Sequence, residues 1–294
     1  VSGFTDMGEW FRADSGGATA AGNFQTFNSS ISTWDTSNVT TMSAMFSNSQ
    51  YNHPGINAWT TSSVEDMSWM FKQSTFNQSV SSWDLTNCTT LYGFLYENED
   101  FNSSLEWSDA MSGVQSLQSM FRSAAAFTHR SPTGWNTAGV TNLKSTFEGA
   151  AAFDHSISGW DVSNVTWFQE MFQDATNYNQ SLSGWVVTGV NTHDDMKNMF
   201  TRAYKFNQPL SSWDVSKVVN MQQMFESCTA FNSSLSGWVL TSITSVANMF
   251  LGASGFNDSS ISSLVFATGL GPDHVPDPGF NATGNTWQMY ADIN

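Results

Sequence analysis

The chain has 294 residues and a net charge of −16, from 25 acidic and 9 basic residues. A protein this acidic, with no basic cluster, is a poor candidate for binding nucleic acid or anionic membrane surfaces. No apolar run of about 18 residues occurs, and no charged segment with an apolar core opens the chain, so neither direct membrane insertion nor a signal peptide is predicted. The numbered chain is either a mature secreted product or a segment of a longer protein.

The chain opens with half of a repeating unit. Met7, Trp10 and Phe11 fit a Met-x-x-Met-Phe pattern that returns about every 25 residues. A Gly- and Ala-rich segment from Gly16 to Gly22 then precedes the first full unit. Because later copies keep the same register, we expect each unit to pack only against its neighbours.

Two aromatic columns run through the full units and are predicted to form the core. The Trp column comprises Trp34, Trp59, Trp83, Trp107, Trp135, Trp160, Trp185, Trp213 and Trp238. The Phe column comprises Phe46, Phe71, Phe121, Phe147, Phe172, Phe200, Phe225 and Phe250, with Leu95 in the remaining unit. One unit cannot bury its apolar stripe alone, so stacked neighbours must complete the core.

Each unit is predicted to contain a short helix and a short strand. Val39, Met42, Met45 and Phe46 have the spacing of one helix face, and Ser37 or Asp35 could cap it. The segment from Phe76 to Trp83 is typical of a short strand or extended stretch. The predicted fold class is an α/β repeat solenoid, leucine-rich-repeat-like, with about ten coils of one strand and one helix.

The end of the chain departs from the repeat. Ser263 stands where the next Trp would lie, and a Pro/Gly-rich stretch from Gly269 to Gly279 follows. We therefore predict a solenoid over residues 1–268 and an interrupted tail with a degenerate half repeat over 269–294. Half a coil at each end has two interpretations. The chain is a segment of a longer array, or its ends meet between subunits to form a fibre.

An Asn follows the aromatic residue in most units and predicts a ladder of side chains that hydrogen-bond the backbone of the coil's turn. Its members are Asn28, Asn52, Asn77, Asn102, Asn179, Asn207, Asn232 and Asn257, while Thr128 and Asp154 replace Asn in two units. Many of these residues lie in N-glycosylation sequons, but an inward side chain could not carry a glycan. The preferred acceptors are therefore Asn38, Asn87, Asn164 and Asn281.

Two units carry insertions on the same edge, around Ser108–Gly113 and Val190–Asp195. Such insertions are surface loops, and in solenoids they can mark a binding face. The second insert contains His193, Asp194 and Asp195, the most plausible isolated cation site, although weak. An intermittent acidic column, Asp35, Asp84, Asp161 and Asp214, is interpreted as helix-start or turn acids, with a calcium row as the alternative. No other cofactor is predicted.

No catalytic motif is present: the sequence has no nucleophile elbow, phosphate loop or dinucleotide fingerprint. The two cysteines, Cys88 and Cys228, lie in distant repeats, beyond disulfide reach in a stack. Cys88 replaces Val39 in register and is predicted to be a core residue. We therefore expect a protein that is not an enzyme.

The unit resembles the BspA-like surface-protein repeat, a 25-residue variant of the leucine-rich repeat, over residues 1–265. The matches are clearest at WDTSNVTTMSAMF (34–46), WDVSNVTWFQEMF (160–172) and WDVSKVVNMQQMF (213–225). This resemblance implies an extracellular solenoid for adhesion, protein interaction or surface structure, without catalytic residues. The chain lacks the lipobox and anchor of such proteins, which leaves its mode of attachment open.

The predicted function is a non-enzymatic extracellular or cell-surface structural glycoprotein. It would build a surface filament, appendage or coat by head-to-tail stacking of solenoid ends, with copies of itself or other surface proteins as partners. The alternative is an adhesin or recognition module that binds a protein or glycan through one solenoid face. Clustered exposed aromatic residues would favour the alternative, and an evenly Ser/Thr/Asn surface would favour the structural role.

Overall fold

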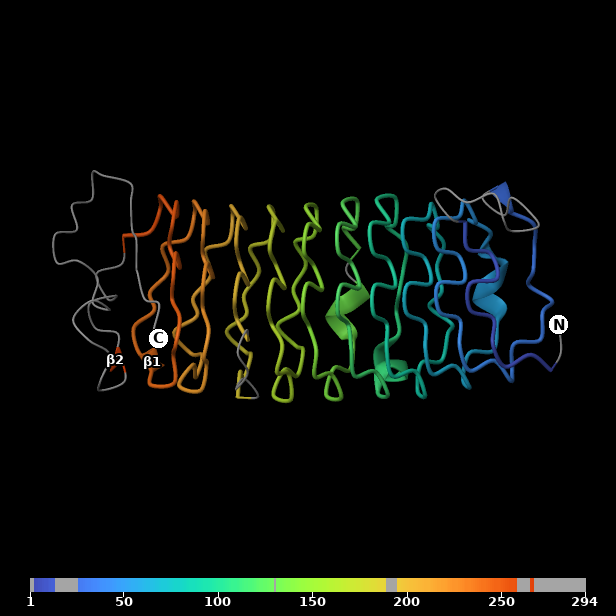
Figure 1. The fold of residues 1–294 in the computed structure, drawn as a ribbon, viewed down its shortest axis with the longest axis horizontal. Coiled ribbons are helices and arrows are strands. Elements are labelled where there is room, and N and C mark those ends of the chain that lie inside the picture. Colours follow the sequence, from blue (N-terminus) through green and yellow to red (C-terminus); the bar gives the residue numbers. More distant parts are fainter. Residues whose placement is uncertain (1–2, 14–25, 130, 189–194, 258–264, 267–294) are drawn as a thin grey trace.

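The computed structural model describes residues 3–13, 26–129, 131–188, 195–257 and 265–266. Successive passages of the chain, here called coils, lie side by side in chain order along one long axis (Figure 1). Parallel single-residue bridges connect equivalent residues of neighbouring coils, as between Thr41 and Asp66 and between Asp66 and Thr90. Each coil is therefore held against the next in a fixed register.

Regular secondary structure is sparse in the described residues. There are three short 3-10 helices, η2 (Pro54–Ala58), η3 (Ser108–Met111) and η4 (Ser131–Gly134). Two strands, β1 (Val239–Leu240) and β2 (Val265–Phe266), pair in parallel. The predicted insert at Ser108–Gly113 contains η3, whereas residues 190–194 of the second insert lie outside the described residues.

The helix predicted in each unit is wrong: no described residue belongs to an α-helix. In the first full unit, the N–H groups of Met42, Ala44 and Phe46 donate to carbonyls of the next coil at 2.8–2.9 Å. Alternate N–H groups turn back within the same coil, Met45 to the carbonyl of Met42 at 3.2 Å and Ser47 to that of Ala44 at 3.1 Å. The segment thus forms successive turns that share their hydrogen bonds between two coils.

Left-handed backbone conformations explain why this segment does not continue as a helix. Ala44 and Asn48 have φ angles of +53° and +58°, four residues apart. A residue in this conformation interrupts a right-handed helix, and for an L-residue it costs roughly 1–2 kcal/mol. The same pair recurs in the following coils, at Trp69 and Gln73, Gly93 and Glu97, and Ser119 and Ser123. We call residues 42–49 and their equivalents the double turn.

The strand predicted from Phe76 to Trp83 is also absent, since none of these residues is in a strand. Trp83 closes a turn by donating its N–H to the carbonyl of Val80 at 3.1 Å. The N–H of Asn77 donates to the side-chain oxygen of Asn52, at 2.8 Å, rather than to a backbone carbonyl. Because a side chain takes the place of the backbone acceptor, this half of the coil stacks without forming a sheet.

Aromatic side chains fill the interior of the stack. Every Trp of the Trp column is at most 4% exposed except the half-buried Trp34, and every Phe of the Phe column is at most 2% exposed. Rings of neighbouring coils lie nearly parallel. Phe200 and Phe225, for example, have centroids 5.6 Å apart and an interplanar angle of 1°. Such pairs contribute about 0.5–1.5 kcal/mol beyond the burial of their area.

The indole N–H groups of this column are all satisfied from Trp59 onward. Each Nε1–H donates to a backbone carbonyl of the preceding coil at 2.7–3.1 Å. Trp83, for example, donates to the carbonyl of Ile56 at 2.9 Å. A buried polar group needs such a partner, so each Trp both fills the core and ties two coils together. The structure therefore shows a stack of coils directly, whereas the assignment of this stack to the leucine-rich-repeat-like class stays a prediction.

Candidate functional site

The Asn ladder is a chain of hydrogen bonds along the stack. In every step except that from Thr128 to Asp154, the Oδ1 atom of one member accepts the backbone N–H of the next, as Asn179 accepts from Asn207 and Asn207 accepts from Asn232, at 2.9 and 2.8 Å. The two replacements take part as well. Thr128 donates its N–H to Asn102 Oδ1 at 2.9 Å, and Asp154 Oδ1 accepts the N–H of Asn179 at 2.8 Å. The ladder is therefore structural in its contacts.

The ladder side chains do not point into the core, which corrects the reason given for excluding them as glycan acceptors. Asn28, Asn207, Asn232 and Asn257 are exposed, and the other ladder members are exposed or half-buried. A glycan is attached through Nδ2 and leaves the Oδ1 acceptor in place. Position in the ladder therefore does not by itself prevent glycosylation.

The preferred acceptors occupy a different turn. Asn38, Asn87 and Asn164 are exposed, and Asn281 lies outside the described residues. The Nδ2 atoms of Asn87 and Asn164 donate to carbonyls of the preceding coil, Ser62 at 2.7 Å and Ala138 at 3.0 Å. Modification of these two side chains in the folded protein would have to displace that hydrogen bond. Their assignment as glycan acceptors stays a prediction.

The acidic column after Trp stabilises turns. Asp35 Oδ1 accepts both the N–H and the hydroxyl of Ser37, at 3.1 and 2.6 Å, and Asp84 Oδ1 does the same with Thr86. These hydrogen bonds to the ionised form lower the pKa of both carboxyl groups below the usual range. Asp161 and Asp214 also accept the N–H of the residue two positions later. The contacts support the turn interpretation over a calcium row.

The weak cation candidate is only partly described, because His193 and Asp194 lie outside the described residues. Asp195 is fully buried, and its carboxylate accepts the backbone N–H groups of Val219, Asn220 and Met196 at 2.9–3.1 Å. Burial raises the pKa of Asp195, and these N–H donors oppose that rise. Elsewhere in the stack a backbone carbonyl, such as that of Thr40, accepts the equivalent N–H groups. Asp195 therefore acts as a substitute for a backbone acceptor.

The two cysteines are buried and free. Burial raises the pKa of the Cys88 thiol to about 12, so the reactive thiolate is scarce at neutral pH. Cys228 donates its thiol to the carbonyl of Phe200 in the preceding coil. Both behave as small core residues.

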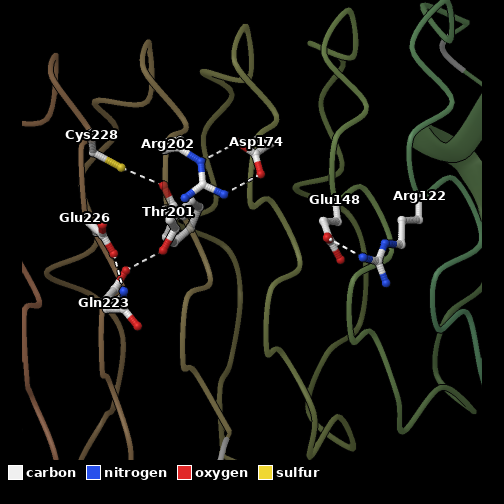
Figure 2. A network of polar contacts seen from close by, with 9 residues as sticks. Arg122, Glu148, Asp174, Thr201, Arg202, Gln223, Glu226 and Cys228 are labelled. Carbon is white, nitrogen blue, oxygen red and sulfur yellow. Dashed lines mark hydrogen bonds and ion pairs between the residues drawn. The ribbon is translucent and has the colours of Figure 1, made fainter.

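Charged side chains gather on the double turns of the central coils (Figure 2). Arg202 forms a bidentate pair with Asp174 at 2.6 and 2.7 Å, and Arg122 pairs with Glu148 at 2.9 Å. Burial raises the pKa of Glu148, which is only 8% exposed. These charged residues of the double turns were not predicted from the sequence. The available signal was the variable residue after the Phe column, which becomes Arg122, Glu148, Gln173, Thr201 and Glu226 in successive units.

The first described coil ends in unpaired backbone acceptors. The N–H groups of Met7, Glu9 and Phe11 donate to the next coil at 2.9–3.0 Å. The carbonyls of the residues before them accept no hydrogen bond in the described part of the chain; these are Asp6, Gly8 and Trp10. In every interior pair of coils the equivalent carbonyls are occupied, for example that of Asp66 by Met42.

The last described double turn has the opposite polarity. The carbonyls of Ser245, Ala247 and Met249 accept N–H groups from the preceding coil at 2.9 Å. The N–H groups of Val246, Asn248 and Phe250, each one residue later in the chain, donate no hydrogen bond to any residue that the structure describes. Among the described residues, the first coil therefore presents acceptors at its outer edge and the last double turn presents donors, in the same register. We call them the acceptor edge and the donor edge.

Comparison with known families places the repeat. One family model matches residues 17–133, 107–196 and 190–264, and so most of the chain. The chain belongs to the DUF285 family, described as a "Mycoplasma protein of unknown function". No curated protein matches the chain. The DUF285 matches span the units that carry the Trp column, the Phe column and the Asn ladder.

Two features are absent from the described residues. No helix there is long and apolar enough to cross a membrane. No group of three or more His, Cys, Asp or Glu side chains there is arranged to hold a metal ion.

Proposed function

We propose that this protein is a non-enzymatic extracellular structural glycoprotein that builds a surface filament, appendage or coat by head-to-tail stacking. Its membership of the DUF285 family supports a repeat protein. The finer resemblance of its units to BspA-like repeats supports a location at the cell surface. The non-enzymatic part of the proposal rests on the packing and turn roles found for the prominent repeat residues.

The complementary edges carry the proposal. If the donor edge of one copy met the acceptor edge of another, the inter-coil hydrogen bonds of the stack would continue across the joint in the same register. The joint would pair the N–H of Val246 with the carbonyl of Asp6, Asn248 with Gly8 and Phe250 with Trp10. Unpaired sheet-like edges readily join other chains, and a head-to-tail contact of this kind does not close on itself, so it produces a filament.

Electron microscopy and sedimentation velocity of the purified 294-residue chain test the proposal. We expect assemblies that lengthen along a single axis as the protein concentration rises. A protein that stays monomeric at high concentration in both measurements would overturn it.

A pair of matched substitutions separates edge contacts from general surface effects. Phe4 belongs to the first coil, is 51% exposed and packs against Trp10 with ring centroids 5.1 Å apart. Val186 is 57% exposed on an interior coil. Phe4→Lys should shorten the assemblies by placing a charge beside the acceptor edge, and Val186→Lys should leave them unchanged. Equal effects of the two variants would contradict assembly through this edge.

The alternative function, an adhesin or recognition module, is favoured by one observation. Three aromatic side chains, Trp69, Tyr92 and Tyr96, cluster on one face of neighbouring coils rather than in the core.

A further inference from the structure

An aromatic patch interrupts the small polar surface of the double turns. Trp69 lies against Tyr92 and Tyr96, with ring centroids 4.2 and 5.3 Å apart, and all three side chains are half-buried. The residues equivalent to Trp69 in other coils include Ala44, Ser119 and Ser145. Core packing does not require an aromatic residue at this position, so the patch is a local addition to the repeat.

The Trp69 ring has a prepared seat on the next coil. Gly93 lies directly beneath it, and a Cβ at Gly93 would come within 2.2 Å of Cε3 of the indole. The φ angle of Gly93, +60°, belongs to the double turn and does not demand Gly, since the two neighbouring coils place Trp69 and Ser119 there. The missing side chain therefore makes room for the indole against the backbone, where it also contacts the two tyrosines.

The residues that follow Trp69 in the sequence supply polar groups next to the patch. Lys72 Nζ lies 5.2 Å from the Trp69 centroid and 5.5 Å from the Tyr96 centroid. Gln73 Nε2 donates to Glu97 Oε2 at 2.6 Å across two coils. Lys72 is long and flexible, so it can shift to donate to a ligand's hydroxyl groups while the ring stays in place.

An open depression of about 440 Å³ is lined by Gln73 and Glu97, which directly follow Lys72 and Tyr96 in the chain. Its lining is polar and spans three coils, with Gln73, Ser74, Thr75, Glu97, Glu99, Asp100 and Ser123. Amides, carboxylates and hydroxyls of this kind both donate to and accept from hydroxyl groups. A ligand that covered the ring and entered the depression would meet an apolar face and then a hydrogen-bonding wall.

We propose that Trp69 and this depression form a binding site for a neutral oligosaccharide. A pyranose ring has an apolar face that fits a flat indole, and hydroxyl groups around its rim that fit the polar lining. Charge selects the neutral class. Glu97, Glu99 and Asp100 face the depression and outnumber the single cation Lys72 at the ring, so they would repel acidic sugars, and the nearby cation Arg122 is paired with Glu148 at 2.9 Å.

Isothermal titration of the full chain with cellotetraose, chitotetraose and mannotetraose tests the site, with tetragalacturonate as the acidic probe. We expect at least one neutral tetrasaccharide to bind, and tetragalacturonate to bind at least about tenfold more weakly. Trp69→Ala should weaken binding of the neutral sugar by about tenfold or more, and Trp69→Phe should weaken it less, because it keeps part of the ring.

Trp167 provides the matched control. It is 38% exposed on another coil and has no aromatic partner among the described residues. Trp167→Ala should bind the neutral sugar as the unmodified chain does, and circular dichroism should show that both Ala variants remain folded. Absence of binding by all three neutral sugars, tighter binding of tetragalacturonate, or equal losses in the two Ala variants would each overturn the proposal.

Discussion

At the scale of single residues, the column Trp side chains combine packing with one buried hydrogen bond. Trp83 is 1% exposed and donates from Nε1 to the carbonyl of Ile56 at 2.9 Å. Trp83→Phe would keep an aromatic ring but remove one of the two hydrogen bonds that this carbonyl accepts, the other coming from the N–H of Trp59 at 3.0 Å. We expect a loss of about 0.5–1.5 kcal/mol of unfolding free energy, the usual net contribution of one hydrogen bond, measured by urea denaturation.

Trp167→Phe is the control for that measurement. Trp167 is 38% exposed, and its indole N–H has no partner in the described part of the stack. Its replacement should change stability by less than about 0.5 kcal/mol, as surface substitutions usually do. Similar losses for both variants would show that ring size, not the hydrogen bond, sets the cost.

The turn carboxylates predict a dependence of stability on pH. Hydrogen bonds from the hydroxyl and N–H of Thr86 lower the pKa of Asp84 below its usual value of 3.8. The folded state therefore binds its proton less readily than the unfolded state. The stabilisation is fully present above a pH of about 4 and is lost as pH falls through the lower folded-state pKa. Because Asp84 is exposed, the effect should stay below about 1 kcal/mol.

Asp84→Asn isolates this contribution, because the amide keeps an acceptor oxygen but does not titrate. The difference in unfolding free energy between the unmodified chain and the variant should shrink between pH 5 and about pH 2. Urea denaturation at a series of pH values measures it. A constant difference over this range would contradict the role given to the ionised carboxylate.

At the scale of elements, the double turn and a helix make opposite predictions for one substitution. Ala44 has a φ of +53°, which costs an L-residue roughly 1–2 kcal/mol, so Ala44→Gly relieves strain. The greater freedom of Gly in the unfolded chain offsets about 0.5–1 kcal/mol of this gain. We expect a net stabilisation of about 0.5 kcal/mol by urea denaturation, whereas in a helix the same change would destabilise by about 1 kcal/mol.

Ala150→Gly is the matched control, because Ala150 is fully buried and does not have a positive φ. It should destabilise the protein by about 0.5–1 kcal/mol. Loss of stability in both variants would contradict the special conformation assigned to Ala44.

The Asn ladder contains its own test of which atom matters. Asn207 Oδ1 accepts the N–H of Asn232 at 2.8 Å, and Asp154 performs the same role for Asn179 at 2.8 Å. Asn207→Asp keeps the acceptor and should be tolerated. Asn207→Ala removes it and should cost about 1 kcal/mol in urea denaturation. Asn207 is followed by Gln208 and Pro209 and is not in a sequon, so glycosylation cannot confuse the result. Equal stability of the two variants would contradict the ladder's contribution.

At the scale of the whole molecule, net charge opposes assembly. Each copy carries a net charge of −16, so two copies repel one another at low ionic strength. Screening shortens the Debye length from about 30 Å at 0.01 M salt to about 8 Å at 0.15 M. If assembly proceeds through backbone hydrogen bonds at the edges, sedimentation velocity should show longer assemblies as salt rises over this range. Assemblies that dissolve on adding salt would instead indicate an interface held by charge attraction.

The sequence by itself determined which residues share a register. Regular spacing of aromatic residues requires equivalent positions to stack, so the buried Trp and Phe columns and the Asn ladder could all be read from it. It also placed the acids of the turns, because a carboxylate and the hydroxyl two residues later are local partners.

The tertiary structure alone decided where the backbone hydrogen bonds go. The spacing of Val39, Met42 and Phe46 suits a helix and a chain of turns equally well, and the choice depends on acceptors in a neighbouring coil about 25 residues away. For the same reason, the surface position of the ladder side chains, the use of Asp195 as a backbone substitute, the unpaired edges and the seat of Trp69 on Gly93 could not be predicted. Each is a contact between coils, and register shows which residues are neighbours but not which atoms meet.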